Sequence, residues 1–95
     1  MQLPPYLQTT LTTLQRIYPQ GVPEGDYLAL LVALHDLLSD RNLAAVVAEL
    51  IDGETVVVAN DAAAAQSIRR PKTEDVKRIR AVLAENGLVD EESDL

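Results

Sequence analysis

The sequence of 95 residues contains no cysteine. Disulfide bonds, thiolate catalysis and zinc or iron–sulfur sites with cysteine ligands are therefore excluded. Because small secreted domains often depend on disulfides, this absence favours a cytoplasmic protein. The chain also has a single histidine, His35, and one histidine without cysteine makes a poor transition-metal site. We therefore predict neither a metal site nor a cofactor.

Phenylalanine and tryptophan are also missing, so the core must be aliphatic. Hydrophobic residues nevertheless make up 47% of the chain, a share typical of globular domains and not of disordered chains. The chain is long enough for one core, whereas two halves would each be too short to bury much surface. We expect a single helical domain over residues 1–89, followed by an acidic, flexible tail over residues 90–95.

No apolar run is long enough to cross a membrane. The longest, from Tyr27 to Leu34, falls far short of the roughly 20 residues that a membrane span needs. The N-terminus has no basic region followed by an apolar stretch, so we expect no signal peptide. The net charge of −7 at pH 7 repels phosphate backbones and disfavours general nucleic-acid binding.

What the chain does contain is apolar residues at helical spacing. This pattern predicts five helices, at about residues 4–17, 27–38, 40–51, 61–68 and 74–85. The second helix is apolar on nearly every side, so we expect it to be the central one, packed against at least two others. The predicted fold is all-α, a compact bundle of about five helices.

Several residues are candidates for helix caps. The side chains of Asp26, Ser39 and Thr73 are predicted to accept hydrogen bonds from the free N–H groups that begin the second, third and fifth helices. Gly87 is expected to end the fifth helix in a left-handed conformation, with the next apolar residues folding back onto the helix.

Residues 55–59, Thr-Val-Val-Val-Ala, form the only strand-like stretch. A lone strand has no partner in this chain, so we predict an extended connector that inserts Val56 or Val58 into the core. Pairing of this segment with another copy of the chain is the alternative. The fourth helix would then begin after a cap at Asn60 or Asp61.

No catalytic motif is recognisable. None of the three serines lies in a Gly-x-Ser-x-Gly sequence, and no glycine-rich phosphate loop is present. His35 and Asp36 are adjacent on a helix and point in different directions, so they cannot form the histidine–aspartate pair of a catalytic triad. Glu49 and Asp52 are spaced for acid–base work but are better explained as a solvated helix face. We predict no catalytic residues, no metal ligands and no enzyme activity.

The unusual feature of the charge pattern is a basic segment in an acidic chain. Within residues 69–80, six basic and two acidic residues give a net charge of +4. The basic residues are Arg69, Arg70, Lys72, Lys77, Arg78 and Arg80. Two interpretations are open: a solvated face that balances local carboxylates, or a binding patch for an acidic protein partner or a nucleic acid.

Residues 18–27 read Tyr-Pro-Gln-Gly-Val-Pro-Glu-Gly-Asp-Tyr. This stretch resembles the Tyr-Pro-x-Gly-Val-Pro-x-x-Asp-Tyr signature of domain-of-unknown-function family 3349, a family of small actinobacterial proteins. Shorter matches follow at residues 30–31, 38–40 and 71–79. The family has a Gly-Trp-Pro near its end, where this sequence has Gly-Leu-Val at residues 87–89. The resemblance implies a bundle of about five helices and implies no activity.

Taken together, the missing catalytic groups and the segregated charge predict a non-enzymatic helical module that binds a protein partner. We expect it to be a monomer or a weak homodimer with no membrane partner. The alternative is a nucleic-acid-binding helical domain that uses the basic segment at residues 69–80. A third hypothesis is an enzyme that uses carboxylates or a bound cofactor.

Overall fold

The computed structural model describes residues 3–88 of the chain. Within this range it contains five α-helices and one short 3₁₀ helix, and no strand. In chain order these are α1 (Pro5–Ile17), η1 (Glu24–Asp26), α2 (Tyr27–His35), α3 (Asp40–Ile51), α4 (Thr55–Gln66) and α5 (Thr73–Glu85). The prediction of an all-α bundle of five helices is confirmed. The predicted acidic tail, residues 90–95, lies outside the described residues.

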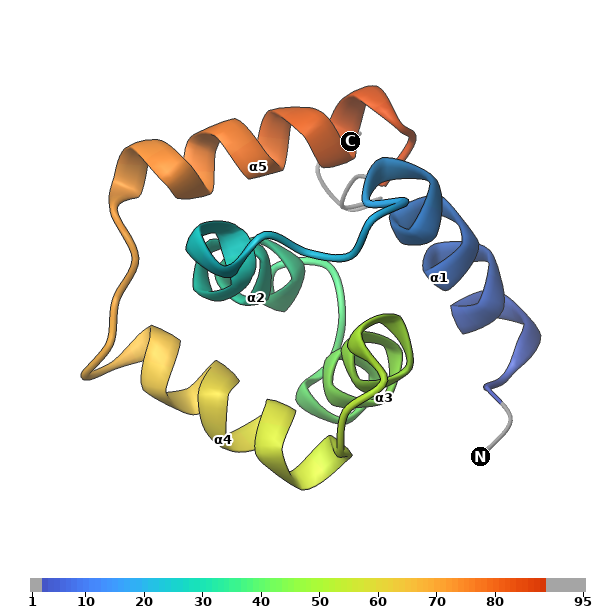
Figure 1. Cartoon of the computed structure of the whole chain (residues 1–95), viewed down its shortest axis with the longest axis horizontal. Coiled ribbons are helices and arrows are strands. Elements are labelled where there is room, and N and C mark those ends of the chain that lie inside the picture. The colour runs from blue at the N-terminus through green and yellow to red at the C-terminus, as the bar shows by residue number, and fades with distance from the viewer. Residues whose placement is uncertain (1–2, 89–95) are drawn as a thin grey trace.

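Helix α2 lies at the centre of the molecule, with the other helices arranged around it (Figure 1). It packs against α3, α4 and α5, while α1 packs on α3. Five residues of α2 are buried: Ala29, Leu30, Leu31, Ala33 and Leu34. The prediction of a central helix with at least two packing partners is therefore confirmed, because a helix that is apolar on every side is stable only where every side is covered.

Helix α2 ends at His35, three residues earlier than predicted. The N–H groups of Leu37 and Leu38 both donate to the carbonyl of Leu34, at 2.9 Å each, so the chain leaves the helix in a tight turn. Leu37 and Leu38 remain packed against the core from this turn. Their apolar character, which extended the helical pattern in the sequence, serves packing here and not helix formation.

One of the three predicted N-terminal caps is present. The hydroxyl oxygen of Ser39 accepts a hydrogen bond from the N–H of Asn42, at 3.2 Å, and so caps α3. The other two predicted side-chain caps are absent, although Asp26 does hold the N-cap position of α2. Asp26 ends η1, which runs directly into α2, and its carboxylate accepts from Arg78 of α5 instead. Thr73 is the first residue of α5, and no side chain caps that helix.

Left-handed residues end both α3 and α5. Gly87 has a φ of 88°, and the N–H of Leu88 donates to the carbonyl of Leu83 at 2.8 Å, which confirms the predicted cap of α5. In α3 the left-handed residue is Asp52, with a φ of 56°, and Gly53 follows it. Aspartate tolerates this conformation better than most residues because its short polar side chain can bond locally.

The predicted extended connector at residues 55–59 is wrong. Helix α4 begins at Thr55 and includes this segment, so Asn60 and Asp61 lie in the middle of the helix and not at its cap. Each valine disfavours a helix by only about 0.5 kcal/mol relative to alanine. The run of four alanines that follows and the burial of one valine outweigh this small penalty.

The three valines of α4 divide between the core and the solvent. Val58 is fully buried, as the sequence predicted for one of the valines. Val56 and Val57 point outward and are 60% and 50% exposed. Val58 belongs to an inward face with Ala62 and Ala65, at spacings of four and three residues, which is a helical repeat.

The packing of α2 makes a direct prediction about stability. We expect Leu34→Ala to lower the free energy of unfolding by about 2–5 kcal/mol, because Leu34 is fully buried and its truncation leaves a cavity. The control is Ile68→Ala, where the side chain is 84% exposed and the change should stay within about 0.5 kcal/mol. Urea denaturation measures both, and equal losses would contradict the central place of α2.

Candidate interaction surfaces

Two arginines of the predicted basic patch form ion pairs that join α5 to other elements. The guanidinium of Arg78 lies 2.7 Å from the carboxylate of Asp26 in η1 and 3.6 Å from that of Asp75 in α5. The hydrogen bond to Asp26 raises the pKa of Arg78 above its ordinary value. The guanidinium of Arg80 lies 2.5 Å from the carboxylate of Asp36, at the end of α2. These two ion pairs therefore link α5 to η1 and to the end of α2, beside the buried contacts of Val76, Ile79 and Leu83.

The other four residues of the patch are placed differently. Arg69 lies 3.8 Å from the carboxylate of Asp61 in α4, at the edge of the ion-pair range. Arg70, Lys72 and Lys77 form no ion pair with a carboxylate within residues 3–88. The six residues are thus divided between internal ion pairs and side chains that have no ion pair with a described residue, instead of forming one continuous basic surface.

Arg70 and Arg80 do come together at a pocket between α4 and α5. The pocket has a volume of about 280 Å³, and its wall also includes Thr73 at the start of α5. Val32 and Val76 form apolar parts of the wall. Because Arg80 also bonds Asp36, this pocket carries less positive charge than two unpaired arginines would give.

His35 lies on the surface. Its ring nitrogen Nε2 is 3.1 Å from the carboxylate of Asp40, the first residue of α3, and both side chains are exposed. Asp36 faces Arg80 and not His35, so the two adjacent residues have separate partners. In the described part of the chain, no three histidine, aspartate or glutamate side chains are grouped in a way that could hold a metal ion.

A groove that the sequence did not predict lies beside the first half of α4. We call it the α4 groove. Its volume is about 470 Å³, and it is bounded by η1 and the start of α2 on one side and by the α3–α4 turn on the other. The lining residues are Val22, Glu24, Tyr27, Ile51, Gly53, Glu54, Val57, Val58 and Asp61. We call its aliphatic lining residues the floor, and we call the exposed lining carboxylates Glu24 and Glu54, together with the neighbouring exposed Asp52, the rim.

A hydrogen bond between Tyr27 and Asp61 fixes one end of the α4 groove. The Tyr27 hydroxyl donates to the Asp61 carboxylate at 2.8 Å, which ties the first residue of α2 to the middle of α4. Burial raises the pKa of Tyr27 well above its ordinary value, and the bond to Asp61 and the charge of Asp61 raise it further. The Tyr27 phenol is therefore neutral, and its hydroxyl proton is already donated to Asp61 in a hydrogen bond.

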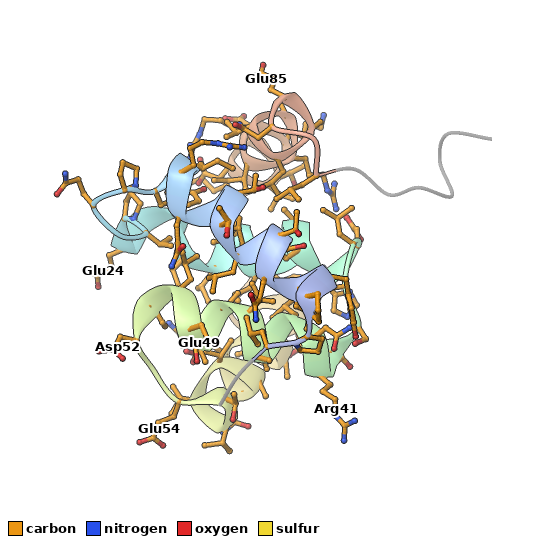
Figure 2. All side chains as sticks on the ribbon, turned by 90° about the vertical axis from the view of Figure 1, so that its right-hand side faces the viewer. Glu24, Arg41, Glu49, Asp52, Glu54 and Glu85 are labelled. Atoms are coloured by element: carbon orange, nitrogen blue, oxygen red, sulfur yellow. The ribbon has the colours of Figure 1, made fainter. Side chains whose placement is uncertain are left out.

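The rim of the α4 groove carries negative charge that no described residue balances, whereas the other lining carboxylate, Asp61, lies 3.8 Å from Arg69. Glu24, Asp52 and Glu54 project along one edge of the molecule (Figure 2). None of the three forms an ion pair with a described residue, and no arginine or lysine within residues 3–88 lines the groove. The groove therefore combines an apolar floor with an acidic border.

A second groove lies on the other side of the start of α4. It has a volume of about 720 Å³ and is formed mainly by Leu3, Leu7 and the small residues of α3, with Val56 at its edge. Asp40 and Arg41 both line it, so its charge is mixed. The first turn of α4 is thus a ridge between two hollows, with Val56 facing one and Val57 facing the other.

Comparison with known proteins identifies a family and no activity. A family model described as "Protein of unknown function (DUF3349)" matches residues 5–91. A search of curated proteins and a search of solved structures each found no match. In the described residues, no helix is both long and apolar enough to span a membrane.

The Tyr27–Asp61 contact predicts how stability depends on pH. The pKa values of Tyr27 and Tyr18 are both raised in the folded protein, so unfolded tyrosines lose their protons at a lower pH than folded ones. Stability from these groups is complete below about pH 10 and is lost as the pH rises towards the folded pKa values. Urea denaturation across this range measures the effect.

The matched variant is Tyr27→Phe, which removes the ionisable group and the bond to Asp61. It should be less stable than the wild type at neutral pH by about 1.5 kcal/mol. It should also lose less stability than the wild type between neutral pH and about pH 11. Parallel pH curves for the two proteins would contradict the assignment of this linkage to Tyr27.

Proposed function

The chain belongs to the DUF3349 family, whose description assigns no function, and we propose that it is a non-enzymatic module that binds a protein partner through the exposed start of α4. The observation that carries this proposal is the pair of outward-facing valines on the first turn of α4, where Val57 lines the α4 groove and Val56 lines the second groove. Val56 is 60% exposed and Val57 is 50% exposed, and Ile51, across the groove, is 37% exposed. Apolar surface that is continuous with a groove is typical of protein interaction sites.

Folding alone does not favour valine at these two positions. Val58 supplies the inward contact of the first turn of α4, and Val56 and Val57 add little to the core. Glutamate, lysine or alanine would form the exposed helix more readily. Burying a valine side chain contributes about 1.5–3 kcal/mol relative to leaving it in water, so a partner that covers both valines gains substantially. Local choices that disfavour the fold are candidates for function.

The polar groups of the α4 groove support binding better than catalysis. The Tyr27 hydroxyl is held by Asp61. Within residues 3–88, no hydrogen bond joins Glu24 or Glu54 to another side chain. An enzyme site usually places a nucleophile or an acid within hydrogen-bond distance of a base that activates it. The groove offers apolar contact and charge instead.

A nucleic-acid site on the basic segment receives less support. Phosphates would have to compete with Asp26 for Arg78 and with Asp36 for Arg80. The remaining cations of the segment, which form no ion pair within residues 3–88, are too few to outweigh the net charge of −7 at ordinary salt concentrations.

Photo-crosslinking tests the proposed face. The full chain carries a photoreactive amino acid at position 57 and is irradiated in the cells that normally make it. We expect a discrete protein adduct, because position 57 lies at the centre of the proposed contact. The matched control places the same amino acid at Ala81, an exposed residue of α5. Adducts of equal yield at both positions, or none at position 57, would refute the proposal.

Competition in a lysate makes the test specific. Excess unlabelled wild-type protein should abolish the adduct at position 57, while excess Val57→Asp should not. Aspartate at the third residue of α4 favours the helix dipole, so this variant should fold, and circular dichroism checks that it does. Equal competition by the two proteins would mean that the adduct does not report a contact through this face.

A further inference from the structure

We infer that the partner segment that fits the α4 groove is basic and amphipathic, with an aliphatic or aromatic anchor flanked by lysine or arginine. This inference rests on the proposed function and adds the chemistry of the partner. Two features of the groove support this inference: its apolar floor and its acidic rim. A single ligand that fits both must supply an apolar group and a positive charge.

The floor of the groove suits an apolar anchor of one or two side chains. Val57, Val58, Val22 and Ile51 line it, together with the ring of Tyr27. Its volume of about 470 Å³ lies in the range of pockets that bind small ligands or inserted side chains. Because the Tyr27 hydroxyl already donates to Asp61, the floor offers little hydrogen bonding and mainly apolar contact.

The rim carries charge in places where the fold gains nothing from it. Asp52 sits at the C-terminal end of α3, and Glu49 precedes it by three residues, while no basic residue lies in the last turn of that helix. The C-terminal end of a helix is the negative end of its dipole, so carboxylates there are unfavourable and cations are favourable. A lysine or arginine from a partner would lie beside these carboxylates, at the negative end of the α3 dipole.

Glu24 and Glu54 extend this acidic border around the groove. They come from η1 and from the residue before α4, and they project along the same edge as Asp52 (Figure 2). Three carboxylates from separate elements repel one another when no cation lies between them. The net charge of −7 also attracts a basic partner at long range and speeds its association.

A second copy of this chain is the competing occupant. Ile68 is 84% exposed and is followed by Arg69 and Arg70, so the chain itself displays a short segment of the inferred chemistry. The net charge opposes association between copies, which favours a separate partner. The experiment therefore has to measure self-association as well as binding.

A labelled probe peptide tests the inference in fluorescence anisotropy. The probe has two leucines flanked by lysines and arginines, and it is titrated with the full chain at low salt. We expect it to bind at least roughly tenfold more tightly than a peptide with serines in place of the leucines, and more tightly than one with glutamates in place of the basic residues. Affinity should fall as salt is added.

Charge-matched variants locate the binding site. Asp52→Asn combined with Glu54→Gln should weaken binding of the probe roughly tenfold, since it removes two rim charges. Asparagine tolerates the left-handed conformation of Asp52, so the fold should be retained. Glu74→Gln combined with Glu85→Gln removes the same charge from exposed positions of α5 that form no ion pair with a described residue, and it should change the affinity by no more than about twofold.

Three results would overturn the inference. They are equal binding of the leucine and serine peptides, equal losses in the two charge-matched variants, and self-association of the chain that Asp52→Asn with Glu54→Gln abolishes in sedimentation. Any of these leaves the proposed function intact as long as the position-57 adduct forms and is competed. Loss of that adduct would remove the proposed function itself.

Discussion

The burial of α2 is the constraint on which the rest of this structure depends. This helix has nine residues, and five of them are inaccessible or nearly so. A helix this short is marginal in water, and one without a polar side has no solvent face to offer. It forms only because α3, α4 and α5 cover it. The five helices are therefore one unit around α2, and α5 covers it through the buried side chains of Val76, Ile79 and Leu83, with the ion pairs of Arg78 and Arg80 beside them.

Covering α2 also explains why α4 is a helix from its first residue. The segment at residues 55–59 has the composition of a strand, and local propensity favours an extended conformation. A strand there would leave its backbone N–H and carbonyl groups without partners, because the described chain offers no second strand. As a helix the segment satisfies these groups internally and presents Val58 to the core. Val56 and Val57 are then necessarily turned outward, since a helix spreads three consecutive residues around its axis.

Most of the fold could be predicted from the sequence, and most of the candidate site could not. Helical spacing depends on the local sequence alone. It is shown by the apolar residues on one side of α1, α3 and α5 and by those of α2. The start of α4 at Thr55 depends on two things: no other described segment can pair with residues 55–59 as a strand, and Val58 shares a helical spacing with Ala62 and Ala65. This spacing can be seen in the sequence, but the β-branched residues 55–58 favour a strand and so predict the wrong structure. The α4 groove joins residues from η1, α2, α3 and α4, and no local pattern brings these together.

The charged residues show the same difference between what the local sequence indicates and what the tertiary structure determines. In the sequence, the basic segment at residues 69–80 is the conspicuous feature and the acidic residues are scattered. In the folded protein, Arg78 and Arg80 are engaged with Asp26 and Asp36, whereas Glu24, Asp52 and Glu54, which form no ion pair with a described residue, lie along one edge of the bundle (Figure 2). A charge that the fold already neutralises has little left to offer a ligand, whereas an unbalanced charge beside exposed apolar surface can be matched only from outside the described chain. Binding is therefore better sought at the acidic edge of the bundle than at the segment whose composition first attracts notice.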